Sequence, residues 1–110
     1  MKQHITDKAE VSVDFPDKVY YGSFGRHSTF DVRADEHGVH IDLQRDEGER
    51  RHVGFHIHYY LLGDILASLA NSLSKLRDLD EPHRDTLRDA VKHLAQALDR
   101  RPRKRPRRER

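Results

Sequence analysis

Residues 30–43 read Phe-Asp-Val-Arg-Ala-Asp-Glu-His-Gly-Val-His-Ile-Asp-Leu, and this stretch decides the fold. Apolar and polar residues alternate on both sides of residues 35–38, which is the pattern of two half-buried strands joined by a four-residue turn. Pairing Ala34 with Val39 places the apolar residues of both segments on one face and the polar residues on the other. The stretch therefore predicts an antiparallel hairpin with a single apolar face.

The alternation extends over residues 9–58, where we expect about five antiparallel strands in meander order. A second hairpin is predicted around the turn at residues 46–49, and two registers are open for it. In one register Leu43 lies opposite Val53. In the other register the whole pairing is shifted, and Leu43 lies opposite Arg51.

After residue 58 the apolar period changes to 3.6 residues, which predicts a helix over residues 59–78. Asp80, Glu81 and Pro82 combine a capping acid with a first-turn proline and predict a second helix over residues 82–99.

Two antiparallel helices that cover the apolar face of the sheet would give a two-layer α+β fold in a single domain, residues 1–99. Phe55 and Val32 are expected to be buried beneath these helices.

Charge is distributed unevenly along the chain. Residues 100–110 contain eight of the 21 Lys and Arg residues and one of the 19 Asp and Glu residues, a local charge of +7. Residues 1–99 keep 13 basic and 18 acidic residues, a charge of −5. The tail has nothing apolar to bury, so we expect it to be disordered in isolation.

An arginine-rich tail can neutralise phosphates or dock on an acidic protein. The predicted nucleic-acid or acidic-partner contacts are Arg100, Arg101, Arg103, Lys104, Arg105, Arg107, Arg108 and Arg110. A solubilising extension without a specific partner is the alternative. The tail has no interleaved aromatic residues, so base stacking is not implied.

Nine histidines are present, and two of them form a His-x-His pair at residues 56 and 58. On a strand both imidazoles project from one face, about 6.5–7 Å apart at the backbone, and such a pair can bind one Zn²⁺, Ni²⁺ or Cu²⁺ ion. His52 shares this face, and in the first register His40 lies directly opposite His56, with Asp42 as an oxygen ligand nearby. The candidate metal ligands are His40, His52, His56 and His58. Solvated surface histidines, or a pH-sensitive patch without metal, are the alternatives.

The chain has no cysteine, which excludes disulfides, thiolate metal sites and cysteine catalysis. It also has no apolar run of about 20 residues that could cross a bilayer and no signal-peptide pattern, so a cytoplasmic protein is expected. No nucleophile elbow or phosphate loop is present. The small-residue face of the first helix and an aromatic strand around Tyr20 and Tyr21 leave monomer and homodimer both open.

These observations favour a non-enzymatic binding or adaptor protein whose basic tail contacts nucleic acid or an acidic partner. A metal- or pH-responsive protein that uses the histidine face is the first alternative. A small enzyme or ligand-binding domain, with its pocket between sheet and helices, is the second.

Overall fold

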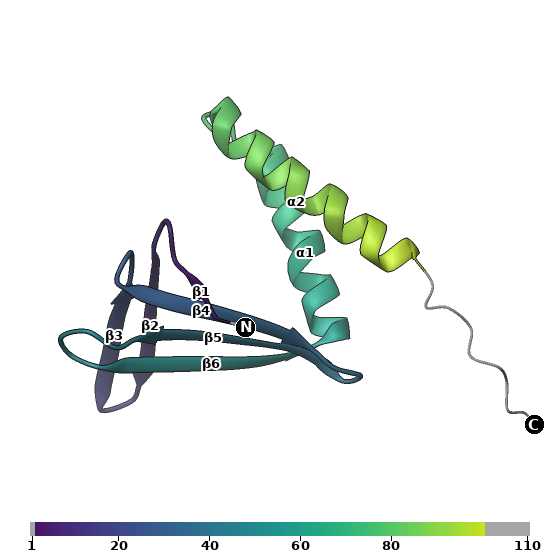
Figure 1. Cartoon of the computed structure of the whole chain (residues 1–110). Helices are drawn as coiled ribbons and strands as arrows, with labels where there is room; N and C mark the ends of the chain where they lie inside the picture. Colours follow the sequence, from purple (N-terminus) through teal and green to yellow (C-terminus); the bar gives the residue numbers. More distant parts are fainter. Residues whose placement is uncertain (1, 101–110) are drawn as a thin grey trace, which may run out of the picture. The chain divides into compact units, whose positions relative to one another are not determined.

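The computed structural model describes residues 2–100. The chain divides between Ala70 and Asn71 into two compact units. The first unit contains all the strands and the first three turns of helix α1, and the second contains helix α2 (Figure 1). The predicted boundary between a domain at 1–99 and a tail at 100–110 stays a prediction, because residues 101–110 lie outside the described part of the chain.

The larger sheet has four antiparallel strands in the order β1-β4-β5-β6 (Figure 1). Its strands are β1 (Gln3–His4), β4 (Ser28–Ala34), β5 (Gly38–Arg45) and β6 (Arg51–His58). Ala34 pairs with Val39, as the alternation predicted. Leu43 pairs with Val53, which selects the first of the two registers. The α+β class and the single apolar face of β4, β5 and β6 are thus confirmed.

A separate two-stranded sheet is formed by β2 (Ala9–Phe15) and β3 (Lys18–Phe24). The predicted meander of five strands is therefore wrong at β3, because β1 rather than β3 pairs with β4. The reason is local. The Ser28 N–H donates to the Gly25 carbonyl in a tight turn, and the Ile5 N–H donates to the Ser28 carbonyl, so the N-terminal segment occupies the edge of β4.

The two helices are α1 (Tyr59–Ser74) and α2 (Glu81–Asp99). α1 starts directly after β6, with no connecting residue, and it ends four residues before the predicted boundary. α2 begins one residue before the predicted boundary, but with the predicted cap and proline: an oxygen of the Asp80 carboxylate accepts the His83 N–H at 3.1 Å, and Pro82 lies in the first turn. Within the described residues, no helix is long and apolar enough to cross a membrane.

The stabilisation of α2 by the Asp80 cap should depend on pH. The His83 N–H and the His83 imidazole lower the pKa of the Asp80 carboxyl, so the folded chain binds this proton less readily than the unfolded chain. The resulting stabilisation is present above the ordinary carboxyl range and is lost as the pH falls through the lowered pKa. Asp80→Ala should therefore lower the helix content and Tm measured by circular dichroism at pH 7, and the difference from wild type should disappear in acid.

Asp85→Ala is the matched control, because its carboxylate makes an exposed ion pair with Arg88 on the same helix. Such a pair contributes little to stability. Equal losses in the two variants, or a loss in Asp80→Ala that persists in acid, would contradict the capping role.

Burial in the single chain differs from the expected core. Phe24, 2% exposed, is the buried hydrophobic residue of the described part of the chain, and neither helix contributes a buried side chain. Val32 and Phe55, on the apolar face of the larger sheet, are 53% and 41% exposed. Within the first unit, α1 does not bury these two side chains, so their expected burial beneath this helix is wrong.

Candidate metal site

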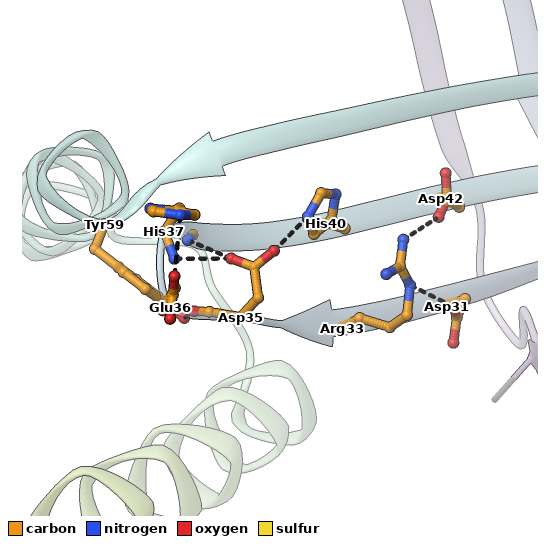
Figure 2. Close-up of polar contacts among 9 residues, drawn as sticks. Asp31, Arg33, Asp35, Glu36, His37, His40, Asp42 and Tyr59 are labelled. Carbon is orange, nitrogen blue, oxygen red and sulfur yellow. Dashed lines mark hydrogen bonds and ion pairs between the residues drawn. The ribbon is translucent and has the colours of Figure 1, made fainter.

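The turn between β4 and β5 is built around the carboxylate of Asp35 (Figure 2). Its Oδ1 accepts the backbone N–H groups of His37 at 2.8 Å and Gly38 at 3.0 Å. Aspartate stabilises turns by bonding to backbone two and three residues further on. The second oxygen, Oδ2, is left to face β5, where it lies 2.9 Å from Nε2 of His40.

His40 and His56 lie directly opposite each other on β5 and β6. Their imidazole rings stack with centroids 4.0 Å apart and planes 6° from parallel. His58 follows on the same face of β6, and its ring centroid is 4.8 Å from that of His56. The predicted register has therefore brought three of the four proposed histidine ligands together.

Asp35, His40 and His56 form a triad that offers two imidazole nitrogens and one carboxylate oxygen. One ligand atom from each residue lies within 4.8 Å of the other two. Zinc binds nitrogen and oxygen ligands at about 2.0–2.2 Å, so two ligands of one ion are on the order of 3–3.5 Å apart. An imidazole nitrogen binds a metal in the plane of its ring, so the stacked rings of His40 and His56 would have to rotate out of the stack for both nitrogens to face one ion.

The surroundings favour the protonation states that metal binding needs. The N–H groups of His37 and Gly38, together with the His40 imidazole, hold the pKa of the Asp35 carboxyl well below its usual range. Partial desolvation, with the neighbouring His40 and His58, lowers the pKa of the His56 imidazole. Asp35 is therefore an anion at neutral pH and His56 is neutral, and these are the ligating forms.

His52 does not join the other predicted ligands. Its Nε2 lies 3.2 Å from Oδ1 of Asp42, and Asp42 pairs with Gly54 across the strands. The other oxygen of Asp42 is 4.0 Å from Nη2 of Arg33 (Figure 2). The structure thus assigns Asp42 to His52 and Arg33, and the carboxylate beside His40 is Asp35, which the sequence reasoning had treated only as a turn residue.

Of the predicted basic contacts, Arg100 is the one within the described residues. Its backbone N–H donates to the Gln96 carbonyl at 3.0 Å and closes the last turn of α2. The contacts predicted at positions 101–110 lie outside the described part of the chain.

A groove of about 350 Å³ lies in the first unit, between the β2–β3 hairpin and β6. Val11, Tyr20, Phe24, Arg51 and Val53 are among its lining residues. Nη1 of Arg51 donates to the Ser23 carbonyl and Nη2 pairs with Glu49, both at 3.3 Å. The Arg51 guanidinium at the groove is therefore already engaged by the chain itself.

Comparison with known protein families, curated proteins and solved structures gives no match for this chain.

Proposed function

We propose that this protein binds a divalent transition-metal ion through Asp35, His40 and His56 and acts as a metal-responsive binding protein. The observation that carries the proposal is the convergence of two imidazoles and a carboxylate within 4.8 Å. A mixed nitrogen and oxygen set suits Zn²⁺, Ni²⁺ or Cu²⁺ better than Mg²⁺ or Ca²⁺, which prefer oxygen ligands alone.

Ligation would replace an interaction that the chain already makes. His40 and Asp35 share a hydrogen bond of 2.9 Å, and the ion would take the place of the bridging proton. His58 is the nearest further imidazole and is the fourth ligand in this proposal, with water as the alternative. The lack of a catalytic motif supports binding rather than catalysis, and the lack of cysteine is consistent with a reducing compartment such as the cytoplasm.

Isothermal titration calorimetry with Zn²⁺, Ni²⁺ and Cu²⁺ tests the proposal. The wild-type chain should take up one ion per chain at neutral pH, and His56→Ala should abolish this stoichiometric uptake because it removes the central ligand. Uptake should also weaken below about pH 6, since protons compete with the ion for imidazole nitrogen.

His52→Ala is the sharpest control, because His52 lies on the same face of β6 but is bonded to Asp42. It should bind the ion like wild type, as should His93→Ala on α2. No binding heat with any of the three ions, or equal losses in His52→Ala and His56→Ala, would reject the triad.

A second candidate function rests on charge. Residues 100–110 carry a net charge of +7, whereas residues 1–99 carry a net charge of −5. We propose that this tail contacts the phosphates of nucleic acid, with an acidic protein as the alternative partner. This candidate is independent of the metal site, and a salt series with and without the tail tests it.

A further inference from the structure

The junction between β6 and α1 lies next to the candidate metal site. β6 ends at His58 and α1 begins at Tyr59, with no residue between them, and residues 59–70 of α1 belong to the same compact unit as the strands. The Tyr59 hydroxyl donates to the Asp35 carbonyl at 2.5 Å, beside the β4–β5 turn (Figure 2). The turn that supplies the carboxylate of the triad is therefore bonded to the first residue of the helix.

Gly38 shows how closely the turn approaches the junction. Gly38 pairs with His58 across the two strands. A Cβ built on Gly38 would overlap the carbonyl oxygen of Ile57 and would lie 2.9 Å from the Cα of His58. Glycine is the residue that permits so close an approach of two backbones. This contact holds the turn against the residue that precedes Tyr59.

The start of α1 is weak in its own sequence. The residue before the helix is His58, which is not one of the favoured capping types, and the first turn contains no acidic residue. Gly63 lies in the second turn, where glycine lowers the stability of a helix. Such an end opens locally unless another contact holds it. The bond from Tyr59 to Asp35 is such a contact.

Asp35 joins the metal site to the helix, because its Oδ2 faces His40 within the triad while its carbonyl accepts the Tyr59 hydroxyl. An ion bound by Asp35 and His56 would tie the β4–β5 turn to the last residues of β6. The Tyr59 bond ties the same turn to the residue that follows β6. Both interactions favour one arrangement of turn and junction, so each should strengthen the other.

We propose that binding of a metal ion at the triad stabilises the start of helix α1 through Asp35 and Tyr59. This inference rests on the proposed metal-binding function and gives that function an output, namely a helix whose first turns become ordered when the ion binds. Tyr59 is a positioning residue in this scheme: it holds the turn that carries a ligand and does not itself bind the ion.

Amide hydrogen exchange of the full chain, with and without Zn²⁺, tests the coupling. In an α-helix the N–H groups of residues 63–66 donate to the carbonyls of residues 59–62, so these four amides report on the start of α1. One equivalent of Zn²⁺ should slow their exchange about three- to tenfold in the wild-type chain, since a single hydrogen bond contributes a factor of about this size.

Tyr59→Phe should separate binding from its effect on the helix. The variant should still take up one Zn²⁺ per chain in calorimetry, and its affinity should fall by the same factor, because coupling between two interactions is reciprocal. Zn²⁺ should no longer slow exchange at residues 63–66. Tyr60→Phe is the matched control: it removes a hydroxyl one residue further along α1, leaves the Tyr59 bond in place, and should behave like wild type.

The possible failures of this test are distinguishable. Zn²⁺ uptake by the wild-type chain without slower exchange at residues 63–66, or equal slowing in Tyr59→Phe, would overturn the coupling and leave the triad in place. An equal loss of helix content in Tyr59→Phe with and without Zn²⁺, measured by circular dichroism, would show that Tyr59 only stabilises the helix and would also overturn it. No binding heat in the wild-type chain would reject the triad and the coupling together.

Discussion

Removing residues 100–110 should eliminate binding to nucleic acid rather than weaken it. These residues carry +7, whereas the remaining 99 residues carry −5 and should repel a polyphosphate. The tail must therefore supply nearly all the attraction. Because it contains no apolar side chain to bury, its removal should leave Tm almost unchanged.

The salt dependence gives this prediction its quantitative form. For the full chain on duplex DNA, log K should fall linearly with log[salt], with a slope no steeper than about −0.9 for each of the eight cations, or about −7. A full-length variant with glutamine at the eight basic positions is the control for tail length and should bind no better than the truncated chain. Equal binding by the truncated chain, or a slope near zero, would instead favour an acidic protein as the partner of the tail.

Phe24→Ala should cost about 3–5 kcal/mol of unfolding free energy. Phe24 is the last residue of β3 and is 2% exposed at the place where the β2–β3 hairpin contacts the larger sheet. Folded domains are stable by only about 5–15 kcal/mol, so this loss is a large share of the total. Denaturant unfolding followed by circular dichroism measures it, and the loss should not depend on protein concentration.

Phe15→Ala is the matched control on the same hairpin. Phe15 is 48% exposed and makes an edge-to-face contact with Tyr20, with ring centroids 5.9 Å apart. Its truncation should cost on the order of 1 kcal/mol, the value of such an aromatic pair. A loss at Phe15 as large as the loss at Phe24 would show that the hairpin is not anchored at Phe24.

The parts of the fold that could be predicted from the sequence are the strands in which apolar and polar residues alternate. The pairing of Ala34 with Val39 follows from a pattern of period two that only one register satisfies. Strand β1 could not be found in this way, because it is two polar residues long and depends on a distant partner, β4. The burial of Phe24 likewise depends on how two sheets meet, which alternation along one strand does not encode.

The two histidines of the candidate metal site could be predicted from the sequence, but its carboxylate could not. His40 and His56 were found because strand register places them opposite each other. Asp35 was missed because its side chain acts across a turn, where no periodic pattern applies, although an aspartate at the start of a turn is itself a signal for local bonding. Asp35 and Asp42 both lie near His40 along the chain. The sequence therefore could not show that Asp35 would bond His40 while Asp42 would pair with His52.

Asp35 has a consequence for how this chain can change over evolution. Its Oδ1 holds the β4–β5 turn, its Oδ2 bonds His40, and its carbonyl accepts the Tyr59 hydroxyl. Selection for a stable hairpin alone would therefore preserve Asp35, and its retention among descendants would carry no information about metal. Among the described contacts, His56 makes ring contacts with His40 and His58 but no hydrogen bond that holds the hairpin. Retention of both His40 and His56 among descendants would therefore be the sign of selection for metal binding.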